Sequence, residues 1–278
     1  MKDRAYAKIN LSLDVFNIRE DGYHDIKSIM IPINFYDELE INIAEKDEYE
    51  CNKKFIRFNE NNSIIKMINV VKEKYNINDH YKVTLNKVVP MQAGLGGGTS
   101  DAGSTLRILK KLYKLNLSKQ EERDLCVAVG ADVLFNYYNT PAVVSGIGDS
   151  VEPFTLSKEY NVLLVKPREG VSTKEAYDNL NMNVCDHPNI EKLKQALQNG
   201  NSIDGLLGNS LEQPAFLLNK EIKSIKDTLI NNGAKNVLMS GSGSTVFVID
   251  EDYKIIEDLS KIIKNDSYYV RLTKTKAI

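Results

Sequence analysis

The chain has 278 residues, of which 42% are hydrophobic and 27% are charged, a balance typical of a soluble globular protein with one large or two ordinary domains. Its formal net charge of -2 provides no overall positive field that would attract nucleic acid or an anionic membrane surface. Partners therefore have to be inferred from individual sites.

The cysteines and the N-terminal segment indicate the cytoplasm. Cys51, Cys126 and Cys185 lie far apart, are odd in number, and form neither a CxxC pair nor a Cys/His ligand cluster, which is typical of a protein in a reducing compartment. In the N-terminal segment MKDRAYAKINLSLDVF, polar and charged residues interrupt any signal core. No run approaches the roughly 18 apolar residues of a membrane span. We expect a cytoplasmic protein that is neither exported nor membrane-embedded.

Strands dominate the first part of the chain. Apolar and polar residues alternate over residues 5–15, which is the period of a strand with one buried face. An Asp-Gly turn at 21–22 follows, and the segments IKSIMIPINF and DELEINIA continue the strand pattern.

A change to helical period marks the next part. Apolar residues recur at helical spacing from about residue 64 to about residue 75, after Ser63 as N-cap. The segment HYKVTLNKVV then predicts a strand that ends before Pro90, and DAGSTLRILKKLYKL predicts a second helix. Residues 90–104, PMQAGLGGGTSDAGS, therefore join a strand to a helix.

A third helix and a domain boundary follow. Ser118 and Glu121 form a capping box, Gly130 is placed as the C-terminal stop, and Asp132 comes just beyond it. The segment PAVVSGIGDSVEPF predicts a strand and a glycine turn, and NVLLVKP opens a second pattern. We place the boundary near residue 155, which divides the chain into domains 1–155 and 156–278.

The second half alternates strands and helices. Strand NVLLV precedes helices near 172–181, 189–199 and 219–232, and then come strand NVLM, the turn SGSGS, strand TVFVI, a helix at about 252–264 and strand SYYVRL. With the extra helices treated as insertions, the order is β-α-β-β-α-β, the split βαβ arrangement.

The glycines at 94, 96, 97, 98 and 103 make residues 90–104 a candidate anion-binding loop. Backbone amides at a helix start lack intrahelical acceptors, and the helix dipole places positive charge there. Glycines remove the Cβ atoms that would keep a phosphate away, and Thr99, Ser100 or Asp101 can cap the helix. The alternative is a glycine-rich turn that serves only close packing of the backbone.

The loop matches neither of two common phosphate-binding patterns. A P-loop requires Gly-Lys-Ser/Thr, and no lysine occurs between 90 and 105. The dinucleotide pattern GxGxxG, counted from Gly94, would place its third glycine at Thr99, and no acidic residue in the right context follows. A dinucleotide-dependent oxidoreductase is therefore disfavoured, and the positive charge that a P-loop lysine supplies has to come from elsewhere in the chain.

The segment PMQAGLGGGTSDAGSTL resembles the central motif of the GHMP kinase superfamily. Three further motifs, AKINLSLDVFNIREDGYHDIKSIM at 7–30, GADVLF at 130–135 and MSGSGSTVFVI at 239–249, narrow the resemblance to kinases that act on 4-diphosphocytidyl-2-C-methyl-D-erythritol in the non-mevalonate isoprenoid pathway. The motifs occur in the expected order over nearly the whole chain. The departures from the family pattern are Gln92, Thr99, Leu134 and Asn136.

The resemblance implies a fold, a reaction and a nucleotide site. The fold is α+β, with an N-terminal ribosomal-protein-type α/β domain at 1–155, a C-terminal ferredoxin-like domain at 156–278, and the active site between them. The reaction transfers the γ-phosphoryl group of ATP, with Mg²⁺, to the 2-hydroxyl of the cytidyl diphosphate ester. The ATP-binding residues implied are Pro90, Met91, Gln92, Ala93, Gly94, Leu95, Gly96, Gly97, Gly98, Thr99 and Ser100.

Two side chains are implied to be catalytic. By the resemblance, Asp132 accepts the proton of the acceptor hydroxyl, and Lys8 lies close to it and stabilises the developing charge. From the residues alone, Asp132 could equally cap the segment that follows, and a lysine on the polar face of a strand is usually solvated.

The residues implied to bind the acceptor are Asn10, Tyr23, His24, Tyr177, Gly241 and Gly243. His24 would recognise the cytosine edge, Tyr177 would stack on the ring, and the glycines would close the site near the phosphates. The alternatives are an ordinary surface or core-edge histidine for His24, a sheet aromatic for Tyr23, a tyrosine in the helix that Ser172 and Glu175 cap for Tyr177, and a simple hairpin turn for the glycines.

Two rival functions stay open at this point. One is another GHMP kinase acting on homoserine or a mevalonate derivative, which the DGYH segment disfavours because those acceptors have no cytosine. The other is a non-catalytic nucleotide-binding or nucleic-acid-binding homologue, which Lys8 together with Asp132 and the near-neutral charge disfavour. We expect a small-molecule substrate, no nucleic-acid or membrane partner, and a monomer or homodimer.

Overall fold

The computed structural model describes residues 1–276, which fold into two compact units. Unit 1 comprises 1–7, 35–90 and 96–139, and unit 2 comprises 8–34, 91–95 and the described residues from 140 onward. Two long strands, β1 (Lys2–Ile18) and β2 (His24–Ala44), contribute residues to both units. The boundary expected near residue 155 separates two family domains along the chain. The two compact units are a different division of the fold and do not test that boundary, which stays a prediction.

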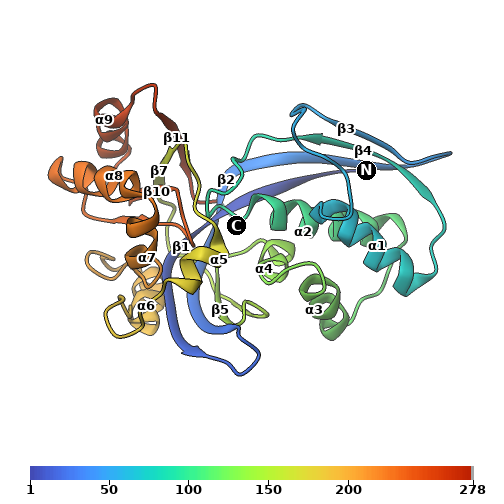
Figure 1. The fold of residues 1–278 in the computed structure, drawn as a ribbon, viewed down its shortest axis with the longest axis horizontal. Helices are drawn as coiled ribbons and strands as arrows, with labels where there is room; N and C mark the ends of the chain where they lie inside the picture. Colours follow the sequence, from blue (N-terminus) through green and yellow to red (C-terminus); the bar gives the residue numbers. More distant parts are fainter. Residues whose placement is uncertain (277–278) are drawn as a thin grey trace. The chain divides into compact units, whose positions relative to one another are not determined.

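Unit 1 is a layer of helices on a layer of strands. Its strands are β3 (Glu48–Cys51), β4 (His80–Asn86) and the unit 1 parts of β2 and β1, in the order β3-β4-β2-β1; β4 is parallel to β3 and antiparallel to β2. The helices α1 (Ser63–Tyr75), α2 (Gly97–Leu112), α3 (Lys119–Val127) and α4 (Val133–Tyr138) lie on one side of these strands (Figure 1). Because α2 packs against both α1 and α4, the helix that follows the glycine loop lies at the centre of the layer.

The helix ends of unit 1 partly match the sequence prediction. The Ser118–Glu121 capping box is confirmed, although α3 ends at Val127, before Gly130. The N-cap of α1 is Asn62 rather than Ser63, because the extended backbone at Asn62 lets its Oδ1 accept the amide of Ile64. Ser63 is instead the first helical residue, and its hydroxyl donates to the carbonyl of Gly98 at 2.6 Å.

Unit 2 contains the predicted β-α-β-β-α-β order, which is confirmed. The strands β7 (Asn161–Pro167), β9 (Val237–Met239), β10 (Val246–Asp250) and β11 (Tyr268–Lys274) form an antiparallel sheet in the order β11-β7-β10-β9. The helices α8 (Lys220–Asn231) and α9 (Tyr253–Ile263) both pack against this sheet (Figure 1).

The remaining elements of unit 2 after residue 140 either precede β7 in the chain or lie between β7 and α8. Between β7 and α8 the chain inserts α5 (Thr173–Asp178), α6 (Ile190–Asn199), β8 (Gly208–Asn209) and α7 (Glu212–Leu218). The strand β8 pairs in parallel with β1, and β5 (Ala142–Gly146) pairs in antiparallel fashion with β2 and with β6 (Ser150–Pro153).

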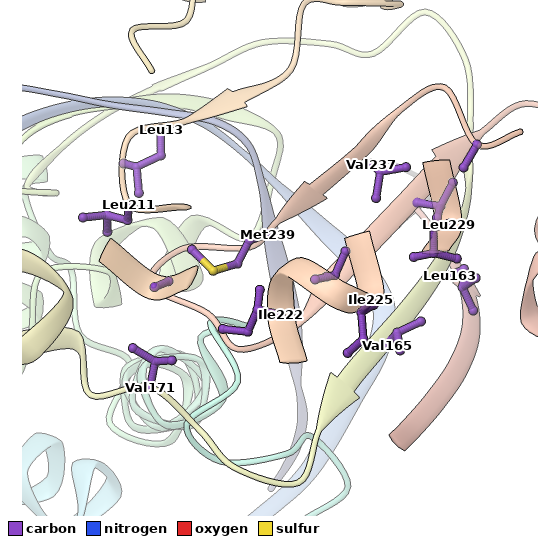
Figure 2. Packing of buried hydrophobic residues seen from close by; sticks show 14 of the residues in the cluster. Leu13, Leu163, Val165, Val171, Leu211, Ile222, Ile225, Leu229, Val237 and Met239 are labelled. Atoms are coloured by element: carbon purple, nitrogen blue, oxygen red, sulfur yellow. The ribbon is translucent and has the colours of Figure 1, made fainter. Parts of the chain in front are cut away.

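The core of unit 2 anchors the turn that follows β9. Figure 2 shows apolar side chains from strands, helices and connections converging in one cluster, including Leu13, Leu163, Val165, Val171, Leu211, Ile222, Ile225, Leu229, Val237 and Met239. Burial of side chains of this size contributes about 1.5–3 kcal/mol each. Met239 is fully buried, so the SGSGST segment starts from a fixed point in the core.

Among the helices of residues 1–276, none has both the length and the apolar character needed to cross a bilayer.

Candidate active site

The second half of the glycine loop opens α2 in unit 1. Gly96 is the N-cap, with a left-handed φ of 68°, and it makes no side-chain cap bond. The first helical bond runs from the amide of Ser100 to the carbonyl of Gly96, so the amides of residues 97–99 have no intrahelical acceptor. The expectation that a residue at 99–101 caps the helix is wrong, because the glycines extend the helix backward and place those residues inside it.

Two of the departures from the family pattern contact each other. The side-chain amide of Asn136 donates to Thr99 Oγ1 at 2.9 Å and to the backbone carbonyl of Asp132 at 2.8 Å. Thr99 in turn donates to the carbonyl of Gly96 at 3.0 Å. Asn136 therefore links the start of α2 to the segment that carries the expected base.

Asp132 occupies the N-cap position of α4 but does not cap it. Its backbone is already helical, with φ -74° and ψ -2°, and its side chain makes no cap hydrogen bond. Val133 and Phe135 just beyond it are fully buried and fix this short helix. α2 approaches this helix closely, because a Cβ at Gly103 would lie 2.8 Å from the backbone of Asn136. The capping alternative for Asp132 is thus not what the geometry shows.

The first half of the loop, residues 91–95, packs against the SGSGST segment in unit 2. Ser240 Oγ donates to the carbonyl of Gly94 at 2.9 Å, and the amide of Thr245 donates to the carbonyl of Ala93 at 3.3 Å. A Cβ on Gly94 would lie 1.9 Å from the carbonyl oxygen of Ser240, and φ at Gly94 is +70°. Only glycine fits there, so this part of the loop is held as closely as a core position.

The backbone at Gln92, one of the departures from the family pattern, has an uncommon conformation. Its φ of 49° is in the left-handed region, which favours glycine and strains other residues. The side chain lies against Gly170, where a Cβ would come within 2.8 Å of Gln92 Cβ. Gln92 is accommodated because its neighbour in space is a glycine.

Lys8 and Asn10 of β1 are buried beside the same turn of unit 2. Lys8 is 3% exposed, so the solvated alternative for this lysine is wrong. Its Nζ donates to Asn10 Oδ1 at 2.6 Å, and Asn10 Nδ2 donates to Ser28 Oγ at 2.9 Å. A Cβ on Gly241 would lie 3.4 Å from both Lys8 Nζ and Asn10 Oδ1. The structure therefore brings the lysine, the asparagine and the first glycine of the turn together.

Polar side chains that the sequence analysis missed hold this turn. Asn209 Nδ2 donates to the carbonyls of Met239 and Gly241, each at 2.8 Å. The hydroxyl of Ser240 accepts the amide of Asn10 at 3.3 Å while it donates to Gly94. Gly243 has φ +88°, and a Cβ there would lie 2.7 Å from Met239 Sδ. Only the fold brings these segments together, so no local sequence signal could have identified Asn209.

His24 and Tyr177 also meet in unit 2. Their ring centroids are 4.9 Å apart, with the planes tilted by 44°. Ser172 caps α5 by accepting the amide of Glu175, as predicted, and Tyr177 packs against the hydrophobic cluster. Tyr23 is 60% exposed at the Asp-Gly turn. The residues expected to read and to stack on cytosine are thus adjacent.

A buried group of three charges lies beside the start of α2 in unit 1, and the sequence analysis missed it as well. Lys87 Nζ contacts Asp37 Oδ2 at 2.6 Å and Asp101 Oδ2 at 2.5 Å. All three side chains are buried. They come from three distant segments, so the group has no local signature. Among residues 1–276, no group of three or more His, Cys, Asp or Glu residues could hold a metal ion.

Comparison with known proteins finds a matching family domain in each half of the chain. The GHMP kinases N terminal domain matches residues 62–146, and the GHMP kinases C terminal domain matches residues 184–266. A 4-diphosphocytidyl-2-C-methyl-D-erythritol kinase of Thermoanaerobacter pseudethanolicus is 40% identical over 278 residues, which cover 99% of this chain and 96% of that protein.

Solved structures give the same result. A crystal structure of 4-(cytidine 5'-diphospho)-2C-methyl-D-erythritol kinase matches with a TM-score of 0.82 and 27% identity over 100% of both chains. Homoserine kinase from Cytophaga hutchinsonii matches with a TM-score of 0.71 but only 15% identity, over 98% of this chain and 94% of that one, and it shows the fold alone. The expected α+β GHMP kinase fold is confirmed, and the chain belongs to the 4-diphosphocytidyl-2-C-methyl-D-erythritol kinase family of GHMP kinases, which are ATP-dependent small-molecule kinases.

Proposed function

We propose that this kinase transfers the γ-phosphoryl group of ATP to the 2-hydroxyl of 4-diphosphocytidyl-2-C-methyl-D-erythritol, giving ADP and the 2-phosphate for isoprenoid precursor synthesis. The observation that carries the proposal is the contact between His24 and Tyr177, which pairs a hydrogen-bonding ring with a stacking ring in a family named for a cytidyl substrate. Proteins read an unpaired base by stacking it on an aromatic ring and by forming hydrogen bonds to the edge of the base.

The nucleotide phosphates bind at the start of α2 in this proposal. The amides of residues 97–99 have no intrahelical acceptor, and the dipole of α2 favours an anion at this end. Mg²⁺ accompanies the nucleotide. Mg²⁺ in such sites is usually held by substrate phosphates, waters and only one or two carboxylates, so the chain needs no cluster of acidic residues for it.

Asp132 and Lys8 act on the reacting groups. Asp132 accepts the proton of the attacking hydroxyl, which raises the nucleophilicity of its oxygen as the phosphoryl group is transferred. Lys8 stabilises the negative charge that develops on the transferred group, and Asn10 holds the Lys8 amine in place through the 2.6 Å hydrogen bond. The burial of Lys8 supports this role, because a charge acts more strongly where water is excluded.

A phosphotransfer assay tests this proposal. Purified protein with ATP and Mg²⁺ is offered the cytidyl ester, homoserine and mevalonate separately, and we expect phosphorylation of the cytidyl ester alone. Asp132→Asn should lower kcat by about 10²–10⁴-fold because it removes the base without changing the size of the side chain. Asp124→Asn, at an exposed carboxylate of α3, is the matched control and should retain the full rate. Phosphorylation of homoserine in place of the cytidyl ester would contradict the proposed acceptor.

Tyr177 provides a test of cytosine recognition. Tyr177→Ala should raise KM for the cytidyl ester by about tenfold, the value of one base–aromatic stack, with little change in KM for ATP. Tyr253→Ala, at an exposed tyrosine of α9, is the control. An unchanged KM in Tyr177→Ala would show that this ring serves only the packing of α5.

We also propose that the enzyme works in the cytoplasm, as a monomer or homodimer, with small molecules and no nucleic acid as its ligands. The net charge of -2 and the three free thiols at Cys51, Cys126 and Cys185 support this assignment. Light scattering of the eluting protein measures the oligomeric state, and a protein larger than a dimer would contradict the proposal.

A further inference from the structure

The three buried charges of unit 1 do not balance. Lys87 provides one positive charge, and Asp37 and Asp101 provide two carboxylates, at exposures of 5%, 0% and 4%. An excess charge buried in a protein is costly unless a proton neutralises it. One of the two carboxylates is therefore under pressure to bind a proton.

The hydrogen bonds identify which carboxylate that is. Asp37 accepts from the amides of Val88 and Val89 through one oxygen and from Lys87 through the other, so its ionised form is well satisfied. Asp101 accepts from Lys87 through Oδ2 only, and its Oδ1 is buried with no partner among the described residues. A bare carboxylate oxygen in that position favours the protonated form of Asp101.

This group lies close to the proposed phosphate site. Asp101 is in the first turns of α2, and a Cβ on Gly97 would lie only 3.2 Å from Lys87 Nζ. Gly97 carries one of the amides that have no intrahelical acceptor. A negative charge on Asp101 would therefore lie close behind amides that face a triphosphate, whereas a neutral Asp101 would not oppose the phosphates.

We propose that Asp101, held by Lys87, is a positioning residue for the nucleotide, and that ATP binding at the start of α2 is accompanied by uptake of a proton at Asp101. The inference rests on the proposed role of the glycine loop. The charged groups that contact Asp101 are Lys87, from the connection after β4, and through it Asp37 of β2. On α1, the polar side chain of Ser63 is bonded to the Gly98 carbonyl.

The titration of these groups agrees with the geometry. Burial, opposed by Lys87 and reinforced by Asp37, raises the pKa of Asp101 to about 7. Burial alone would lower the pKa of Lys87, but the two carboxylates outweigh it and raise that pKa, so Lys87 stays charged. Asp101 therefore titrates near neutral pH, where a bound anion can change the fraction of this side chain that is protonated.

Calorimetric titration of ATP into the whole enzyme, in two buffers of different ionisation enthalpy, counts the protons taken up. We expect wild-type protein to take up a proton near neutral pH, and its Kd for ATP to rise about three- to tenfold relative to Asp101→Asn as the pH increases through about 7, the size of one charge near a helix end. Asp101→Asn has the shape of the neutral form, so its uptake should fall to that of the nucleotide alone. Protonation of ATP itself is common to both proteins.

Two further variants complete the test. Asp101→Ala removes the bond to Lys87 and should raise KM for ATP with little change in kcat, and Asp101→Asn should restore that KM, which separates positioning from general damage. Glu122→Gln, at a buried carboxylate paired with Lys110 at 2.8 Å elsewhere in unit 1, should take up protons as wild type does. Wild-type uptake in Asp101→Asn would overturn the inference.

A separate result would contradict the proposed role of the glycine loop. If Gly97→Ala leaves nucleotide binding unchanged, the phosphates do not bind at this turn and the role of the loop is wrong. If Gly97→Ala weakens binding while Asp101→Asn takes up protons as wild type does, only the role of Asp101 is wrong.

Discussion

The chain has two glycine-rich segments, residues 96–100 in unit 1 and residues 240–245 in unit 2, and their glycines serve opposite purposes. In the first segment the backbone leads into a helix and leaves three amides without intrahelical acceptors. In the second, the amide of Ser240 donates to Thr245 and that of Gly243 donates to Ser240, while Asn209 binds the carbonyl of Gly241. The first is open to a ligand, and the second is closed on itself.

This difference shows that glycine content alone does not identify a ligand site. What distinguishes the two segments is the element that follows each of them. A helix start presents several amides in one direction, whereas a turn between the antiparallel strands β9 and β10 pairs its own amides. The second segment instead holds Gly241 against the side chains of Lys8 and Asn10.

The largest expected effect is at Gly94, which packs on the closed segment. Gly94→Ala should destabilise the protein by about 3 kcal/mol or more, because its Cβ would overlap the carbonyl of Ser240. Gly205→Ala is a matched control, since Gly205 has the same φ of +70° with nothing within 4 Å of a Cβ, and it should cost only about 1 kcal/mol. Denaturant unfolding measures both, and equal losses would show that φ rather than packing decides.

An intermediate effect is expected within the open segment. Gly97→Ala should raise Kd for ATP by about tenfold, because its Cβ would press on Lys87 Nζ and Val89 at 3.2 Å and displace the first turn of α2. Gly98→Ala has only an ordinary contact of 3.6 Å, to Ser63, and should affect ATP binding less. Calorimetry separates the two variants, and a larger effect at Gly98 would reverse this view of the turn.

The most gradual effect is the pH dependence of stability, which is spread over several pH units. Since the folded pKa of Asp101 is raised to about 7, its contribution to stability is present below its unfolded pKa and is lost as the pH rises through about 7. The loss is at most about 1.4 kcal/mol per pH unit, and Asp101→Asn should flatten it. The contribution of Glu122 to stability has the opposite pH dependence. Burial tends to raise its pKa, but its bonds to Lys110 and Tyr137 outweigh burial and lower that pKa, so its contribution to stability is lost as the pH falls. Melting curves of Asp101→Asn and Glu122→Gln across pH check both signs, and parallel curves would contradict them.

Local patterns in the sequence predicted the elements that local forces determine. The capping box at Ser118, the N-cap at Ser172 and the β-α-β-β-α-β order of unit 2 follow from side chains within a few residues of each other or from regular periods. The period of β1 correctly placed Lys8 and Asn10 on one face. It failed to predict their burial, because in unit 2 both faces of this strand are covered.

The rest of the site depends on contacts between distant residues. Lys87 meets Asp37 and Asp101 across 50 and 14 residues of sequence, and Asn209 reaches the Gly241 carbonyl across 32. No period or cap carries such information. The motif resemblance located the loop and the candidate side chains, but it could not show that Thr99 and Asn136, two unusual residues, are bonded to each other.

The path of the chain has a consequence for how the protein is made. The chain passes from one unit to the other five times, after residues 7, 34, 90, 95 and 139. Every residue of unit 1 has therefore been synthesised once residue 139 leaves the ribosome, whereas residues 8–34 pair with β5 and β8, which are synthesised later. The segment that carries Lys8, Asn10 and His24 is among the first to be translated, yet it packs on residues that are made much later, so a prematurely released chain would contain every residue of unit 1 but only part of unit 2.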